Sequence, residues 1–134
     1  MKLLIVEDEP ELVSALQEDL QARGYQVFTA SDGMAAVELA RSEQPDLILL
    51  DLMLPVLDGY RVLKLLKSDE RFRAIPILVI TARADEEDWA LALECGADGC
   101  LTKPLKRDTL YQQIQARIGK GNGHDYGKEA SPPA

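Results

Sequence analysis

Five polar residues stand at the ends of short apolar runs, and together they could carry out phosphoryl chemistry. They are Glu7 and Asp8 after KLLIV (2–6), Asp51 at the end of DLILLD (46–51), Thr81 at the end of ILVIT (77–81), and Lys103 at the end of GCLTK (99–103). An ionised carboxylate is costly to bury without a partner. Asp51 is therefore either half of a buried salt bridge or part of a site at the end of a strand.

The residue types favour a magnesium site. Carboxylates that lie close together repel one another, which raises a pKa unless a cation compensates. One lysine cannot balance three carboxylates, and the single histidine, His124, lies near the C-terminus. Mg²⁺, with Mn²⁺ as a substitute, takes oxygen ligands and keeps waters that phosphate oxygens can replace. A carboxylate beside Mg²⁺, a hydroxyl and a lysine can accept a phosphoryl group as an acyl phosphate.

Hydrophobic periodicity predicts five strands that alternate with five helices. The expected strands are 2–6, 25–29, 46–51, 77–81 and 99–103, and the expected helices begin at Pro10, at Ser31 or Asp32, at Gly59, at Glu86 and before Leu110. Three of the strands are continuous apolar runs, which is typical of parallel strands buried on both faces. This pattern predicts a doubly wound α/β fold. The five polar residues then converge on one cleft, because ligands of such sheets bind beyond the carboxyl ends of the strands.

Composition limits the domain organisation, the compartment and the partners. The 134 residues predict one domain over 1–118, and residues 119–134, with four glycines and two prolines, predict a flexible tail or linker. The net charge of −8 argues against nucleic acid or an anionic membrane as a direct partner. No run is long enough to span a membrane, and acids at 7–9 exclude a signal peptide. Cys95 and Cys100 form no CxxC pair, which predicts reduced thiols in a cytoplasmic protein.

A group of basic residues lies outside this set. Its members are Arg61, Lys64, Lys67, Arg71 and Arg73. Such a run is predicted to form a solvated face, with a docking patch for an acidic partner as the alternative.

Five motifs in this order resemble the receiver domain of bacterial response regulators, the CheY-like family. They are VEDE (6–9), Asp51 within LLDLMLP (49–55), Asp58-Gly59, ITA (80–82) and Lys103-Pro104. The resemblance covers residues 2–118. It implies a flavodoxin-like (βα)5 fold with a five-stranded parallel sheet of order 2-1-3-4-5.

The resemblance also implies roles in two-component signalling. Asp51 would accept a phosphoryl group from a phosphohistidine on a sensor histidine kinase or a histidine phosphotransfer protein. Asp8, Asp51 and the backbone carbonyl of Met53 would bind Mg²⁺, and Glu7 would act through water. The domain would be a phosphoprotein that controls an output domain or effector protein, and not an enzyme with a separate substrate.

A conformational switch belongs to the same resemblance. Thr81 would be the switch hydroxyl, Lys103 would bind the phosphoryl group, and the bond between Lys103 and Pro104 would be cis. Most receivers place Tyr or Phe three residues before this lysine, where this chain has Cys100. Because Cys100 is much smaller, we expect the switch to move less surface. Met53 and Arg83 would flank the path of attacking water and slow dephosphorylation.

Three other functions use similar architectures. A flavodoxin-like cofactor binder needs small or hydroxyl residues after the first strand, where this chain has VEDEPE (6–11). A haloacid-dehalogenase-type phosphatase places its aspartate in DxD after the first strand, whereas Asp51 follows the third. A receiver that acts only as a binding scaffold has no need of all five polar residues. The phosphoacceptor is therefore the prediction.

Overall fold

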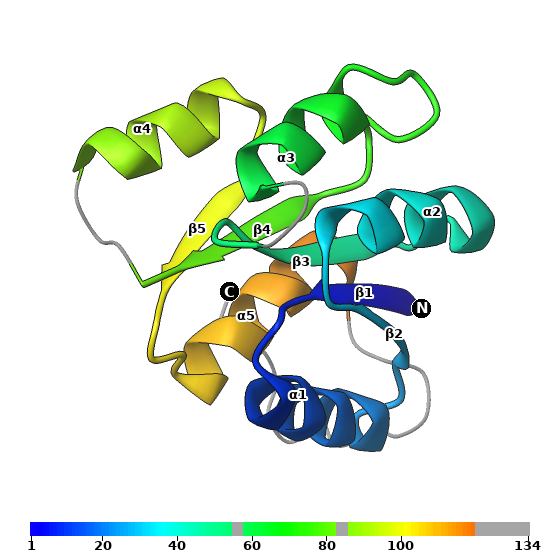
Figure 1. The fold of residues 1–134 in the computed structure, drawn as a ribbon. Coiled ribbons are helices and arrows are strands. Elements are labelled where there is room, and N and C mark those ends of the chain that lie inside the picture. The colour runs from blue at the N-terminus through cyan, green and yellow to red at the C-terminus, as the bar shows by residue number, and fades with distance from the viewer. Residues whose placement is uncertain (55–57, 83–85, 120–134) are drawn as a thin grey trace.

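Five short strands form one parallel sheet in the computed structural model, which describes residues 1–54, 58–82 and 86–119 (Figure 1). They are β1 (Lys2–Val6), β2 (Gln26–Ala30), β3 (Leu47–Asp51), β4 (Ile77–Thr81) and β5 (Gly99–Thr102). Their spatial order is β2-β1-β3-β4-β5, and every neighbouring pair is parallel. The predicted doubly wound α/β fold and its strand order are confirmed. Arg83 and residues 120–134 of the predicted tail lie outside the described residues.

Helices cover both faces of the sheet. α1 (Pro10–Ala22) and α5 (Arg107–Ile118) lie on one face, and α2 (Gly33–Glu43), α3 (Gly59–Lys67) and α4 (Glu86–Glu94) lie on the other (Figure 1). Each face has its own core, with Ile5, Leu20 and Ile114 in the first and Val6 and Phe72 in the second. Every residue of β3 and β4 is buried, as expected for strands that are covered on both faces.

Local signals in the sequence set most of the boundaries. Asp32 caps α2, since its Oδ1 accepts a hydrogen bond of 2.9 Å from the N–H of Ala35. Asp58 caps α3 in the same way, through the N–H of Arg61 at 3.0 Å. β2 begins one residue later than predicted, because the N–H of Tyr25 bonds to the carbonyl of Leu20 and closes the turn after α1. No helix in the described part of the chain is long and apolar enough to span a membrane.

Lys67 departs from the prediction of a solvated basic face. Its side chain is only 14% exposed. Its Nζ donates to the carbonyls of Arg73 (3.0 Å) and Ile75 (2.8 Å) and to Oδ2 of Asp98 (2.8 Å). The same Asp98 oxygen accepts the N–H of Ile77 at 2.8 Å. Lys67 therefore joins the end of α3 to the segments on both sides of β4, at the edge of the sheet where the strands begin.

An acidic site with one lysine at the carboxyl edge of the sheet

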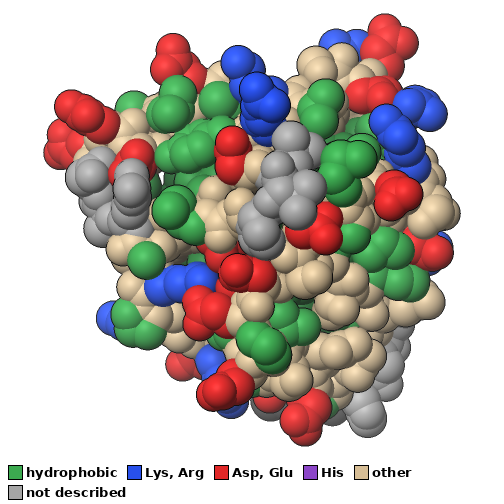
Figure 2. Space-filling view, viewed as in Figure 1, with side chains coloured by type: hydrophobic (Ala, Val, Ile, Leu, Met, Phe, Trp, Pro, Cys, Tyr) green, Lys and Arg blue, Asp and Glu red, His purple; other side chains and the backbone are tan. Residues whose placement is uncertain are grey.

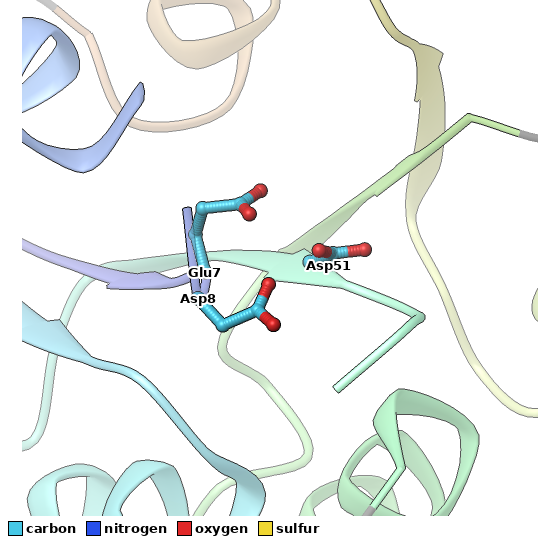
Figure 3. A group of neighbouring side chains, drawn as sticks. All are labelled: Glu7, Asp8 and Asp51. Atoms are coloured by element: carbon cyan, nitrogen blue, oxygen red, sulfur yellow. The ribbon is translucent and has the colours of Figure 1, made fainter. Parts of the chain in front are cut away.

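Three carboxylates meet where β1 and β3 end. Glu7 and Asp8 follow β1, and Asp51 is the last residue of the neighbouring β3. Glu7 and Asp51 are 1% and 3% exposed, whereas Asp8 is exposed. One carboxylate oxygen from each residue lies within 4.8 Å of the others, and the three groups surround a common space (Figure 3). The predicted convergence at this edge of the sheet is therefore present for all three acids.

The site lies in acidic surroundings. Acidic side chains gather near the middle of the face shown in Figure 2, and hydrophobic side chains lie above them over α3 and α4. The exposed Asp8 gives the carboxylate group contact with solvent. The group of three carboxylates therefore reaches solvent at Asp8.

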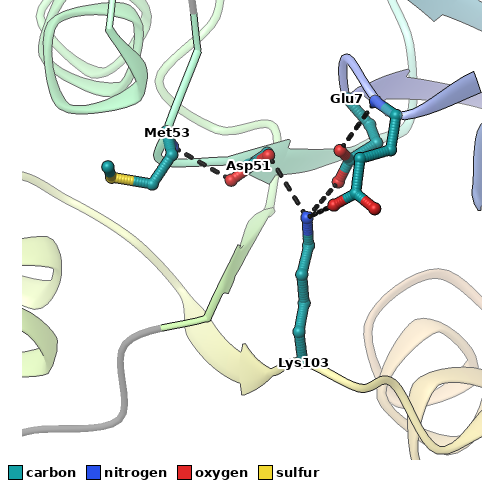
Figure 4. A network of polar contacts seen from close by, with 5 residues as sticks. Glu7, Asp51, Met53 and Lys103 are labelled. Atoms are coloured by element: carbon teal, nitrogen blue, oxygen red, sulfur yellow. Dashed lines mark hydrogen bonds and ion pairs between the residues drawn. The ribbon is translucent and has the colours of Figure 1, made fainter.

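Asp51 is oriented from two directions. Its Oδ1 accepts a hydrogen bond of 2.9 Å from the N–H of Met53, and its Oδ2 lies 3.4 Å from Nζ of Lys103 (Figure 4). Met53 itself is 54% exposed. The backbone of its own loop and Lys103, the residue after β5, therefore orient the carboxylate before any ligand binds.

Lys103 is the cation of the site. Its Nζ lies 2.6 Å from Oε1 of Glu9, 3.0 Å from Oε1 of Glu7 and 3.4 Å from Oδ2 of Asp51. Burial alone would lower the pKa of Lys103, but its interactions with Glu9 and Glu7 and the charge of Asp51 outweigh burial and raise it. The lysine is therefore firmly protonated. The peptide bond between Lys103 and Pro104 is cis.

The environment of Glu7 disfavours the charged form of its carboxyl group. Burial raises the pKa of its carboxyl group, and the charge of Asp51 adds to this effect, against the opposing interaction with Lys103. Its Oε2 accepts the N–H of Glu9 at 3.1 Å. Its Oε1 forms the ion pair with Lys103 but, among the described residues, has no aligned hydrogen-bond donor. A buried carboxylate oxygen with spare acceptor capacity is suited to a cation or to a metal-bound water.

Gly59 holds the loop that follows Asp51. A Cβ atom at this position would lie 2.5 Å from the carbonyl oxygen of Asp51 and 2.5 Å from Cα of Leu52. The N–H of Gly59 donates to the carbonyl of Leu52 at 3.2 Å. The start of α3 therefore packs directly on the backbone of the phosphoacceptor candidate, and only glycine fits there.

Thr81 and Cys100 lie at different distances from this edge. Thr81 is 1% exposed and ends β4, one residue beyond Ile80, the register partner of Asp51. Its carbonyl accepts the N–H of Lys103 at 2.9 Å. Cys100 pairs in register with Val79, is partly buried, and packs against the core on the α3 side. Burial raises the pKa of its thiol. Thr81 thus borders the site, and Cys100 lies further back along the sheet.

Glu9 was not predicted as a site residue, although it makes the shortest contact to Lys103. The only sequence signal is that it is the third acid of VEDE (6–9). The rule that site residues lie at the ends of strands does not predict Glu9, because Glu9 directly precedes α1. Its side chain must extend toward the end of β5 to meet the lysine. The contact depends on the separation of two segments that are 94 residues apart.

Known proteins share this sequence and this fold. The chain matches the response regulator receiver domain family over residues 3–115. It is 45% identical over 115 residues to the alkaline phosphatase synthesis transcriptional regulatory protein PhoP of Bacillus subtilis (strain 168), which covers 86% of this chain and 47% of that protein. It is 39% identical over 116 residues to the transcriptional regulatory protein KdpE of Mycobacterium tuberculosis (strain ATCC 25618 / H37Rv), which covers 87% of this chain and 50% of that protein.

A solved structure agrees with these matches. The receiver domain of sensor histidine kinase PA1611 from Pseudomonas aeruginosa PAO1, with a magnesium ion coordinated in its active site cleft, superposes with a TM-score of 0.81 at 37% identity, covering 88% of this chain and 97% of that one. The chain spans about half the length of the curated relatives it matches. It belongs to the response regulator receiver domain family of two-component signalling.

Proposed function

We propose that Asp51 is the phosphoacceptor of this receiver domain and takes its phosphoryl group from a phosphohistidine on a sensor histidine kinase or a histidine phosphotransfer protein. A carboxylate oxygen of Asp51 attacks phosphorus, the bond from phosphorus to the histidine nitrogen breaks, and the imidazole leaves. The product is a 4-aspartylphosphate. The observation that carries the proposal is the buried, pre-oriented Asp51 carboxylate, with Lys103 at 3.4 Å and two further acids around the same space.

The donor set fits Mg²⁺. Asp8, Asp51 and the backbone carbonyl of Met53 would hold the ion, and Glu7 would act through a metal-bound water. Glu7, Asp8 and Asp51 carry two more negative charges than Lys103 balances, and all three offer the hard oxygen ligands that Mg²⁺ prefers. Mn²⁺ takes the same ligands and is the proposed substitute. A bound ion would supply positive charge to the oxygens of the transferred phosphoryl group.

Thr81 and Lys103 are proposed to bind the phosphoryl oxygens that the metal does not. Thr81 ends β4 next to the strand of Asp51, and Lys103 already lies beside the Asp51 carboxylate. A charge-assisted hydrogen bond to a dianion would draw the Thr81 hydroxyl toward Asp51. Cys100 is too small to sweep the area that an aromatic residue does, so the accompanying rearrangement is proposed to be small. Met53 is exposed beside Asp51 and is proposed to shield the phosphoryl group together with Arg83.

The proposed role is signalling and not turnover of a separate substrate. The domain, over residues 1–118, would take part in its own phosphorylation and autodephosphorylation and would control an output domain or an effector protein. Residues 119–134, of which 120–134 lie outside the described residues, are proposed as a tail or linker that follows the domain. The net charge of −8 supports a role without direct contact to nucleic acid or an anionic membrane. A cytoplasmic location is proposed from the two cysteines, which form no CxxC pair.

Intact-mass measurement after treatment with acetyl phosphate and Mg²⁺ tests the phosphoacceptor. We expect one phosphoryl adduct in the wild type, none in Asp51→Asn, and none in wild type treated with EDTA. Asp108→Asn is the matched control, because Asp108 is an exposed aspartate in the first turn of α5. Labelling of Asp51→Asn to the level of this control would overturn the assignment.

A further inference from the structure

We propose that Glu9 is a positioning residue that holds Lys103 on the rim of the site in the unphosphorylated protein and thereby restrains phosphorylation of Asp51. This inference rests on the proposed roles of Asp51 and Lys103. It adds a residue whose contact with the lysine must be broken before the lysine can serve the phosphoryl group fully.

The distances show which carboxylate holds the lysine. Nζ of Lys103 lies 2.6 Å from Oε1 of Glu9 but 3.4 Å from Oδ2 of Asp51. The contact to Glu9 has the length of a strong charge-assisted hydrogen bond, whereas the contact to Asp51 lies at the long limit for one. The Glu9 side chain is 60% exposed and that of Asp51 is 4% exposed. The ammonium group is therefore drawn from the buried acceptor toward the solvent-facing acid.

Glu9 has no competing structural duty in the described part of the chain. It precedes α1 at the capping position, but its side chain makes no capping hydrogen bond there. Pro10 follows it and has no N–H to offer. The backbone of Glu9 is fixed through its own N–H, which donates to Oε2 of Glu7 at 3.1 Å. The main chain is thus anchored in the site while the carboxylate is left for Lys103.

Glu9 is also separate from the group of candidate metal ligands. The oxygens within 4.8 Å of one another come from Glu7, Asp8 and Asp51. Replacing the Glu9 carboxylate by an amide should therefore leave the affinity for Mg²⁺ unchanged, while it releases Lys103. A phosphoryl group on Asp51 brings further negative charge to the inner position. The lysine must then exchange Glu9 for a phosphoryl oxygen, and the lost ion pair opposes phosphorylation.

The test compares Glu9→Gln with Glu11→Gln. Glu11 lies two residues on in the first turn of α1, is exposed, and undergoes the same loss of one charge. Phosphorylation by acetyl phosphate with Mg²⁺ is followed by intact mass, and Mg²⁺ affinity by calorimetry. We expect Glu9→Gln to raise the steady-state phosphorylated fraction, expressed as the ratio of phosphorylated to free protein, about two- to fivefold over Glu11→Gln. That factor is the usual strength of one partly exposed ion pair.

A second pair of variants separates a contact with Lys103 from a general field effect. In a Lys103→Met background, Glu9→Gln should change phosphorylation no more than Glu11→Gln does, because the contact that it removes no longer exists. In metal-free protein, the side-chain NMR signals of Lys103 should shift in Glu9→Gln and not in Glu11→Gln. This last measurement needs no phosphorylation, so it reports on the contact even if Asp51 is not the acceptor.

The outcomes are distinct. A wild type that acetyl phosphate does not label refutes the proposed function, whereas a labelled wild type with equal gains in Glu9→Gln and Glu11→Gln refutes the restraint by Glu9. A gain that persists in the Lys103→Met background also refutes it, since the effect would then be a change in local charge. A fall in Mg²⁺ affinity confined to Glu9→Gln would assign Glu9 to the metal site and overturn the proposal.

Discussion

Two lysines at opposite edges of the sheet have opposite electrostatic surroundings. Lys67, at the edge where the strands begin, bonds one carboxylate, that of Asp98, and two backbone carbonyls. Lys103, at the carboxyl edge, faces three carboxylates, those of Glu7, Glu9 and Asp51. Both side chains are largely buried, at 14% and 17% exposed. Burial alone therefore does not distinguish them.

The balance of charge distinguishes the surroundings of the two lysines. The Lys67 network is neutral, and its donors and acceptors are matched, so it needs nothing from outside to be stable. The Lys103 site holds an excess of negative charge that a bound cation would offset, and the pKa of Glu7 is raised there, with burial as the main cause. The first arrangement is suited to joining segments of the fold, and the second to binding ions that come and go.

A glycine also packs closely against each of the two networks. Gly59 approaches the backbone of Asp51 and Leu52, and Gly96 approaches the side chain of Lys67, with its would-be Cβ 2.7 Å from Cγ. Gly96 has a φ of +109°, where other residues are strained. The obstacle at Gly59 is rigid main chain, whereas the obstacle at Gly96 is a side chain that can shift. Gly59 is therefore required by the backbone of the site, whereas Gly96 is required by the conformation of its turn.

Exchanging the two lysines for methionine should give the largest contrast. Lys67→Met removes the Lys67 donor from two carbonyls and from Asp98, which keeps only the N–H of Ile77 among the described donors, so we expect a loss of about 3 kcal/mol in the free energy of unfolding. Its labelling by acetyl phosphate should stay near wild type. Lys103→Met should lower labelling strongly but cost less stability when Mg²⁺ is present, because the ion can offset the carboxylate repulsion that the lysine no longer offsets. Urea denaturation and intact mass measure the two effects. If Lys103→Met proves the more destabilising variant, the comparison is wrong.

Replacing each of the two glycines by alanine should further separate the site around Lys103 from the network around Lys67. Gly59→Ala must displace the backbone of Asp51 and Leu52, which we expect to cost about 2 kcal/mol and to weaken Mg²⁺ binding as well. Gly96→Ala should cost about 1 kcal/mol through its positive φ and leave Mg²⁺ binding intact. Thermal unfolding and Mg²⁺ calorimetry check both. Equal Mg²⁺ affinities in the two variants would show that Gly59 does not shape the site.

Added Mg²⁺ should stabilise the folded protein through the carboxylates at the carboxyl edge of the sheet and not through Asp98 at the other edge. At ten times its Kd, Mg²⁺ should raise the free energy of unfolding of the wild type by about 1.4 kcal/mol. Asp8→Asn should lose most of this gain, and its metal-free form should be more stable than the metal-free wild type, because it relieves repulsion between carboxylates. Asp98→Asn, the matched change at the other edge, should keep the gain and be less stable throughout. A metal-free Asp8→Asn that is less stable than wild type would contradict the charge-excess argument.

The smallest effect concerns pH. The pKa of Glu7 in the folded protein is raised above its ordinary value of 4.5, so the folded state holds this proton more tightly than the unfolded state does. Its contribution to stability is complete below pH 4.5 and is lost as the pH rises through the raised pKa. Without metal, the stability difference between wild type and Glu7→Gln should therefore shift against the wild type over this window. Denaturation series at several pH values in EDTA measure it, and a difference that is constant with pH would speak against a perturbed Glu7.

Much of the fold and of the candidate site could be predicted because the signals are local. KLLIV, LILLD and ILVIT are apolar runs of strand length, and the structure has strands at Lys2–Val6, Leu47–Asp51 and Ile77–Thr81. Once the strands are parallel, their carboxyl ends share one edge, so a strand-end acid such as Asp51 is placed there by chain direction alone. The sequence by itself therefore determined which edge of the sheet carries the polar residues that follow the strands.

Only the tertiary structure decided which like residues act. Lys64 and Lys67 are one helical turn apart on α3, yet Lys64 is exposed and Lys67 joins three segments. Glu9 and Glu11 both lie at the start of α1, yet only Glu9 is within an ion-pair distance of Lys103 in the described part of the chain. Periodicity states which face of an element a residue occupies, but an ion pair requires a separation of a few ångströms between segments far apart in the chain. That separation is set by how the helices pack on the sheet, which no local pattern encodes.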